Sequence, residues 1–152
     1  LVKTFLKKIN KENIHKIAKN YDFICDGTDN FKSRLLINDY CIKYKKVLIS
    51  SAISKYDGHV FNFDFRKDGP CLRCFMPSLP SINQNCESEG IMSTLAGIAG
   101  SLQANEVVKS ILNIGKPLKN EIMIFNALDL NFRKVKLKKN SSCRNHLHVL
   151  GK

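Results

Sequence analysis

The chain lacks any apolar stretch long enough to span a membrane, and its first residues do not form a signal peptide. These two absences argue against integral membrane and secreted proteins, and we expect a cytoplasmic protein. At 152 residues, with 43% hydrophobic residues and no internal repeat, the chain is long enough for one domain with a real core. It begins with Leu1 instead of methionine, which is consistent with a native N-terminus further upstream.

Arginine is scarce: the chain has five arginines against twenty lysines, and its net charge is +12. A charge this positive is typical of nucleic-acid-binding proteins. The lysines, however, are scattered over most of the expected elements, and the fifteen asparagines and fifteen isoleucines indicate a compositional bias of the whole chain. We therefore do not expect nucleic acid as a partner. A basic nucleic-acid-binding protein stays an alternative, and its affinity for nucleic acid would fall steeply with salt.

The chain is organised around the stretch Tyr21–Asn30, which reads YDFICDGTDN. Its short apolar run is bounded by turn residues and predicts a buried strand, and a helical pattern follows the stretch. Ligands bind at such strand-to-helix turns in α/β sheets, and two carboxylates three residues apart, Asp26 and Asp29, suit Mg²⁺ and phosphate. In the structural alternative, Asp26 ends the strand and Thr28 or Asp29 caps the helix. Taken alone, these ten residues favour the cap.

The order of the expected elements predicts an α/β fold. Strands are expected over residues 3–9, 23–26 and 47–51, with a short helix capped by Asn10 and a longer helix over residues 31–44 between them. This β-α-β-α-β order calls for a parallel sheet with right-handed crossovers. Several apolar side chains of this part are expected in the core, namely those of Phe31, Leu35, Leu36, Ile42, Cys25 and Cys41.

Beyond residue 55 the pattern changes to that of an antiparallel sheet. Phe61 and Phe63 alternate with Asn62 and Asp64, which predicts a strand with one solvent-exposed face. Two more strands are expected over residues 121–125 and 132–137. Residues 76–90, rich in Pro, Ser and Asn, predict a long surface loop. Residues 91–114 form the strongest helical pattern, with apolar residues at helical spacing: Ile91, Leu95, Ile98, Leu102, Val108 and Ile111.

Two short motifs have the spacing of a zinc site, Cys71-x-x-Cys74 and Cys143-x-x-His146. Together they supply four soft or borderline ligands for tetrahedral zinc, and four protein ligands would make the metal structural instead of hydrolytic. His148 is the alternative fourth ligand. In the alternative without metal, Cys71 and Cys74 are buried thiols and His146 is a residue of the tail. Six cysteines without a secretion signal fit a reducing compartment.

Five stretches, in this order along nearly the whole chain, resemble the ThiF/MoeB/HesA family of bacterial relatives of ubiquitin-activating enzymes. They are DGTDN at 26–30, GPCLRC at 69–74, NCESEG at 85–90, GIAGSLQANEVVK at 97–109 and the Cys143-x-x-His146 motif. We call Cys71-x-x-Cys74 the first knuckle and Cys143-x-x-His146 the second knuckle. The resemblance implies a Rossmann-like parallel sheet that continues into antiparallel strands, with helices on both faces and a zinc site. It also implies a homodimeric enzyme that uses MgATP to adenylate the C-terminal glycine of a ubiquitin-like sulfur-carrier protein, for thiamine, molybdopterin or tRNA thiolation.

The resemblance assigns roles to individual residues. Asp29 matches the family's aspartate near Mg²⁺ and the ATP phosphates, and Asn30 lies beside it in the nucleotide site. Three cysteines match the family's zinc ligands, and His146 stands where the fourth ligand is usually a cysteine, an exchange that zinc accepts. These three are Cys71, Cys74 and Cys143.

Cys86 matches the cysteine that some family members use to form a thioester or acyl disulfide with the carrier. The start of the helix near Ile91 favours a Cys86 thiolate, whereas Glu87 and Glu89 disfavour it. A nucleophile and a plain surface thiol are therefore both open for Cys86.

The family's glycine-rich β-turn-α unit, and the arginine and lysine that follow it, have no counterpart in these residues, which contain no G-x-G-x-x-G. We interpret residues 1–152 as one domain, the C-terminal part of an adenylating domain. The rest would belong to a longer chain, come from another chain, or be lost in a degenerate protein. The strongest alternative is a catalytically silent, zinc-containing module that docks a carrier or partner. ATP–pyrophosphate exchange separates the two, and residues 1–152 alone are expected to show none.

Overall fold

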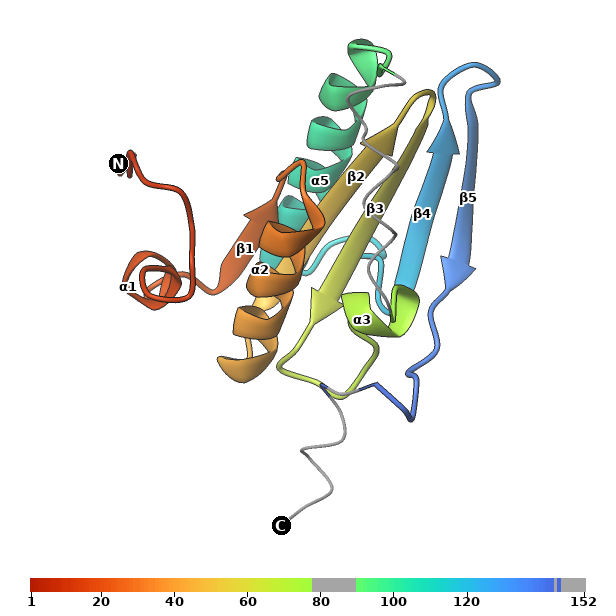
Figure 1. The fold of residues 1–152 in the computed structure, drawn as a ribbon. Coiled ribbons are helices and arrows are strands. Elements are labelled where there is room, and N and C mark those ends of the chain that lie inside the picture. The colour runs from red at the N-terminus through yellow and green to blue at the C-terminus, as the bar shows by residue number, and fades with distance from the viewer. Residues whose placement is uncertain (78–89, 144, 146–152) are drawn as a thin grey trace.

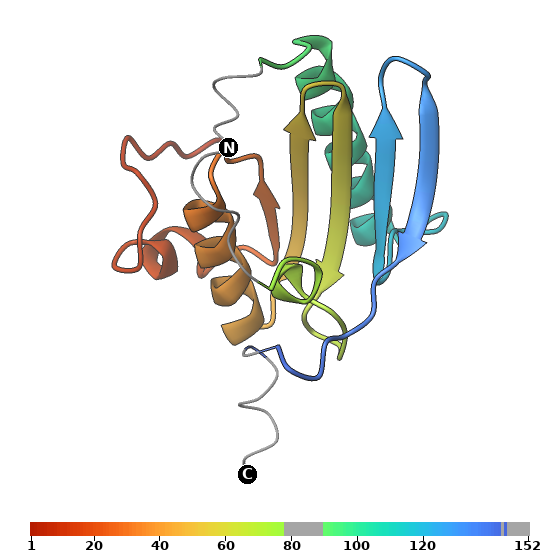
Figure 2. The same cartoon turned by 45° about the vertical axis from the view of Figure 1, so that its right-hand side comes forward.

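The computed structural model describes residues 1–77, 90–143 and 145. This part of the chain forms a five-stranded sheet in the order β1-β2-β3-β4-β5, with helices on both faces (Figures 1 and 2). The strands are β1 (Phe23–Asp26), β2 (Val47–Ser54), β3 (Asp57–Asp64), β4 (Glu121–Asn126) and β5 (Asn131–Lys136). The helices are α1 (Ile14–Ala18), α2 (Phe31–Lys43), α3 (Leu72–Phe75) and α5 (Thr94–Leu112).

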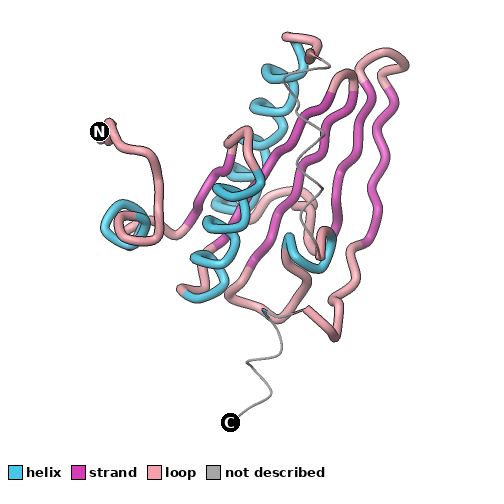
Figure 3. Tube along the Cα trace, in the orientation of Figure 1, coloured by secondary structure: helices cyan, strands magenta, loops and turns pink. Residues whose placement is uncertain are grey.

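The sheet changes from parallel to antiparallel after β2, as the sequence predicts. β1 and β2 are parallel, with Asp26 opposite Ser50, and the later neighbours are all antiparallel. The strand expected over residues 3–9 is wrong: this segment forms an exposed loop, visible at the N-terminus in Figure 3. It does not pair with the edge strand β1 or with any other described strand, and Leu6 is fully exposed.

Helix α2 covers one face of the sheet and supplies much of the larger core. Leu35, Tyr40 and Cys41 pack there with Leu48 of β2 and Phe63 of β3. The helix begins where the sequence places it, but its first residue, Phe31, is exposed instead of buried. The buried face of α2 starts at Ser33 instead of Phe31, and it includes two polar side chains, Ser33 and Asn38.

Helix α5 lies on the opposite face, over β2 and β3, and its buried face is partly polar (Figure 2). The face of β3 expected to be wet is covered: Asn62 is 5% exposed and donates a hydrogen bond to Oε2 of Glu106, at 3.0 Å. Burying Glu106 turns Val108 and Ile111, expected inward, toward solvent. None of the described helices is both long and apolar enough to cross a bilayer.

Cys25 is also exposed, contrary to expectation, whereas Cys41 is buried as predicted. Side chains alternate along a strand, so Cys25 faces away from the core cluster that Ile24 joins. On that side α5 packs on β2 and β3. The edge strand β1 therefore leaves Cys25 at the surface.

Gly58 on β3 provides a sharp test of this packing. It lies opposite Phe125 of β4, and a Cβ atom at Gly58 would stand 2.0 Å from Cζ of that fully buried ring. Because the ring has no room to move, we expect Gly58→Ala to lower the free energy of unfolding by about 1–3 kcal/mol, measured by urea denaturation. The same substitution at Gly97, an open position on α5, should be stabilising by about 0.5–1 kcal/mol. Equal effects at the two glycines would contradict this packing.

Candidate functional site

The turn between β1 and α2 is shaped by the carboxylate of Asp26, which is 1% exposed. Its Oδ1 accepts hydrogen bonds from the backbone N–H of Thr28, at 3.0 Å, and from the Thr28 hydroxyl, at 2.7 Å. Its Oδ2 accepts a hydrogen bond from the hydroxyl of Ser50 on β2, at 2.8 Å. Asp26 therefore has a structural role, and its carboxylate is turned inward.

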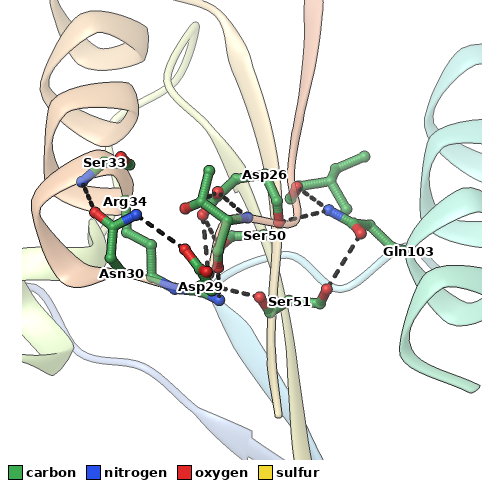
Figure 4. A network of polar contacts seen from close by, with 10 residues as sticks. Asp26, Asp29, Asn30, Ser33, Arg34, Ser50, Ser51 and Gln103 are labelled. Carbon is green, nitrogen blue, oxygen red and sulfur yellow. Dashed lines mark hydrogen bonds and ion pairs between the residues drawn. The ribbon is translucent and has the colours of Figure 1, made fainter. Parts of the chain in front are cut away.

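Asn30, and neither Thr28 nor Asp29, caps helix α2. The side-chain Oδ1 of Asn30 accepts a hydrogen bond from the backbone N–H of Ser33, at 2.8 Å (Figure 4). The amide nitrogen of the same side chain donates to Oδ1 of Asp29, at 3.0 Å. One side chain thus starts the helix and orients the neighbouring carboxylate.

Asp29 is exposed, at the carboxyl end of β1. The hydrogen bond from Asn30 lowers the pKa of Asp29, a backbone hydrogen bond lowers it further, and the charge of Arg34 adds to the effect. The side chain is consequently an anion with free oxygen lone pairs facing solvent, which is what a hard cation such as Mg²⁺ requires.

Arg34, one turn into α2, ties this turn to the next strand. Its Nη1 lies 3.4 Å from Oδ2 of Asp26 and donates to the carbonyl oxygen of Ser51, while Nη2 donates to the carbonyl oxygen of Thr28 (Figure 4). The sequence analysis missed this residue. A signal existed, because a cation in the first turns of a helix opposes the helix dipole and needs a compensating partner.

Gln103 of α5 braces the same edge from the other face of the sheet. Its side-chain amide nitrogen donates to the carbonyl oxygens of Asp26, at 3.0 Å, and Ile49, at 2.7 Å. Its amide oxygen accepts from the hydroxyl of Ser51, at 3.2 Å. The sequence analysis missed Gln103 too; its signal is a polar side chain four residues after the buried Ala99.

Three of the four residues predicted for the second site lie close together in the structure. The sulfur atoms of Cys71, Cys74 and Cys143 all lie within 4.8 Å of one another, although Cys143 is far away in sequence. Cys71 Sγ is 3.9 Å from Cys74 Sγ and 3.7 Å from Cys143 Sγ. Burial, and then the charge of Cys74, raise the pKa of Cys71 to about 12. A thiolate in this position would therefore need a cation beside it, and three clustered sulfurs suit a soft or borderline metal.

A cavity of about 210 Å³ opens elsewhere, at the start of β2 and the end of β3. Arg66, Lys67 and Lys119 line it, together with Asn113 at the C-terminal end of α5. The negative end of the helix dipole opposes the anion that these cations would attract. None of the predicted site residues lines this cavity, and its lining favours no single class of ligand.

Residues 1–145 match the ThiF family. The chain belongs to the ThiF family. Its relatives within that family include named adenylyltransferases. One is the sulfur carrier protein adenylyltransferase of Thermus thermophilus, 34% identical over 148 residues, a match covering 93% of this chain and 55% of that protein. Another is the probable molybdopterin-synthase adenylyltransferase of Pyropia yezoensis, 36% identical over 140 residues, covering 90% of this chain and 37% of that protein.

The SAMP-activating enzyme E1 of Haloferax volcanii is also similar, at 32% identity over 138 residues, covering 90% of this chain and 50% of that protein. This ThiF-family chain thus spans about half the length, or less, of these relatives. Among solved structures, E. coli MccB with MccA-N7isoASN has the same fold, with a TM-score of 0.73 at 16% identity, over 91% of this chain and 44% of that one. The Microcin C7 biosynthetic enzyme MccB in complex with N-formylated MccA gives a TM-score of 0.74 at 15% identity, over 91% of this chain and 44% of that one.

Within this ThiF-family chain, the structure brings together the predicted neighbours Asp29 and Asn30, and it brings together the three predicted cysteine ligands. Two further predicted site residues, Cys86 and His146, and the alternative ligand His148, lie outside the described residues. Their roles stay predictions.

The double role of Asn30 yields a test with two readouts. Asn30→Ala removes the cap and should lower the free energy of unfolding by about 1 kcal/mol, measured by urea denaturation. It also removes the hydrogen bond to Asp29, so an NMR titration should show the pKa of Asp29 rising toward its ordinary value.

Asn30→Asp is the matched control, because it keeps the capping oxygen and adds a negative charge beside Asp29. Stability should then stay near that of the wild type, while the pKa of Asp29 rises further than in Asn30→Ala. Parallel changes in stability and pKa across both variants would show that Asn30 does not act through two separate hydrogen bonds.

Proposed function

We propose that this chain forms part of an enzyme that uses MgATP to adenylate the C-terminal glycine of a ubiquitin-like sulfur-carrier protein. The observation that carries the proposal is the turn at the end of β1, where Asp29 is exposed and accepts a hydrogen bond from Asn30 that lowers its pKa. Its relatives are named as adenylyltransferases that act on sulfur carriers or molybdopterin synthase, which supports the same reaction class here.

In this reaction a carboxylate oxygen of the carrier's terminal glycine bonds to the α-phosphorus of ATP, and the bond from that phosphorus to pyrophosphate breaks. Mg²⁺, when bound, would neutralise the charge that accumulates on the departing pyrophosphate. We assign Asp29 as a ligand of this metal and Asn30 as its neighbour in the nucleotide site. The buried contacts of Asp26 and Arg34 keep the turn fixed, so that the carboxylate of Asp29 is oriented before the nucleotide binds.

The cysteine cluster is assigned to a structural zinc ion held by Cys71, Cys74 and Cys143, with His146 as the fourth ligand. The burial of Cys71 and Cys143 supports a structural role, because a catalytic metal needs an open position. Cys86 is proposed as the thiol that accepts the activated carrier. We place the protein in the cytoplasm, because its cysteines need a reducing compartment. We propose a homodimer from the family resemblance.

A docking module without catalysis is the second candidate. The cysteine cluster favours it, because the three described sulfur atoms lie together without any contribution from the turn at the end of β1. Such a module would bind a carrier protein and catalyse no ATP–pyrophosphate exchange.

The adenylation proposal is tested by ATP–pyrophosphate exchange in the complete native protein with a ubiquitin-like carrier that ends in glycine. Losing a ligand of the catalytic metal costs several kcal/mol of transition-state stabilisation, so Asp29→Asn should slow exchange by about 100-fold or more. Asp22→Asn changes an exposed aspartate just before the start of β1, and this variant should catalyse exchange like the wild type. Exchange unaffected by Asp29→Asn refutes the assignment, and no exchange with any carrier supports the docking module.

The zinc assignment is tested by metal analysis of the purified protein. We expect roughly one zinc per chain, as for a closed four-ligand site, and a lower melting temperature after chelation. Cys143→Ser should lose the metal and the effect of the chelator. Cys25→Ser removes an exposed cysteine outside the cluster and should keep both; zinc retained in Cys143→Ser would contradict the ligand set.

A further inference from the structure

The cysteine cluster does not stand alone, because the second half of α2 lies against it. Asn38 of this helix is fully buried, and its Oδ1 accepts a hydrogen bond from the backbone N–H of Leu72, at 3.0 Å. Leu72 directly follows Cys71. The backbone of the first knuckle is therefore fixed to α2 at one residue from a sulfur ligand.

The next residue of α2, Asp39, forms an ion pair with Arg73, which lies between the two cysteines of the first knuckle. Arg73 donates from Nε to Oδ1 of Asp39, at 2.9 Å, and from Nη2 to Oδ2, at 2.6 Å. Arg73 is only 9% exposed. A buried guanidinium with a two-pronged carboxylate partner has a fixed orientation, which limits how the residues on both sides of it can move.

Asp39 also reaches the second knuckle. The amide nitrogen of Asn145, two residues after Cys143, donates to Oδ1 of Asp39, at 2.9 Å. The same nitrogen lies 3.9 Å from Cys71 Sγ. Burial acts to raise the pKa of Asp39, but the hydrogen bonds from Arg73, Asn145 and Asn38 outweigh it and lower the pKa. The carboxylate is therefore ionised and accepts from both knuckles at once.

We propose that Asp39 is a positioning residue that joins the two cysteine knuckles and so holds their sulfur atoms in the arrangement that binds zinc. This inference rests on the zinc site of the proposed function. Residues that hydrogen-bond the surroundings of a metal ligand set its orientation, and their loss typically weakens metal binding about 10–100-fold. Here the carboxylate of Asp39 is the connection between segments that are far apart in sequence, Arg73 and Asn145.

The alternative is an ordinary buried ion pair that stabilises α3 whether or not a metal is bound. The two roles differ in what they change. An ordinary ion pair alters the stability of the metal-free protein and leaves the rate of zinc release unchanged, whereas a positioning residue alters zinc release and the geometry of the metal site.

The test is the rate at which zinc passes from the loaded protein to an excess of a chromogenic chelator. In Asp39→Asn an amide nitrogen replaces one acceptor oxygen and faces the donors of Arg73 or Asn145, so release should be about 10–100-fold faster than in the wild type. Cobalt substituted for zinc should show a weaker sulfur-to-cobalt charge-transfer band. The control is Asp64→Asn, which breaks a pair of the same two-pronged geometry with Arg66, and it should release zinc like the wild type.

Asn145→Ala removes the hydrogen bond from the second knuckle to Asp39, together with the contact of the same nitrogen to Cys71 Sγ, and leaves the Arg73 pair intact. It tests the same idea in a variant that keeps the buried ion pair. It should release zinc faster than the wild type, and adding Asp39→Asn to it should have less than the multiplied effect, because both changes break the same connection. Release within twofold of the wild type in Asp39→Asn and Asn145→Ala overturns the inference while leaving the zinc site in place. A wild-type protein that binds neither zinc nor cobalt overturns both.

Discussion

The buried carboxylate of Asp26 is the contact on which the turn between β1 and α2 depends. A charge this deep in a protein is tolerated only when donors surround it, and here these donors come from the turn, from β2 and from α2 (Figure 4). Because they come from three elements, satisfying Asp26 fixes the turn relative to both neighbours. The exposed Asp29, three residues later, is oriented as a consequence.

The two aspartates of the DGTDN stretch therefore have different roles in the turn: Asp26 fixes its structure, and Asp29 is exposed to solvent. The one directed inward is fully paired, and the one directed outward keeps its charge and most of its lone pairs. Taken alone, the sequence of this stretch offers both carboxylates as metal ligands, or Asp26 as the end of the strand and Asp29 as a possible cap, and only the family resemblance singles out Asp29. The structure separates them, because the alternation along β1 turns Asp26 toward Ser50 and the chain reverses before Asp29.

The local part of the fold was predictable from the sequence. β1, the turn, α2 and the change from parallel to antiparallel pairing follow from short-range periodicity and turn residues, and the three cysteines follow from ligand spacing. The errors concern contacts between distant residues. Asn62 appears solvent-exposed by alternation, yet it pairs with Glu106, 44 residues away. Periodicity assigns polar residues to the surface and has no information on which of them find a buried partner.

The same limit explains why Arg34, Gln103 and Asp39 escaped a motif-based analysis, although each holds a site together. Helix α2 carries two of them: its first turns contact the turn after β1 through Arg34, and its second half contacts the two knuckles through Asp39. A helix of 13 residues spans about 20 Å. Helix α2 thus contacts both places, so a metal ion bound by the cysteine cluster would fix the second half of the helix whose first residues are capped by Asn30. A structural zinc ion would in this way support the turn that carries Asp29 without taking part in the proposed adenylation.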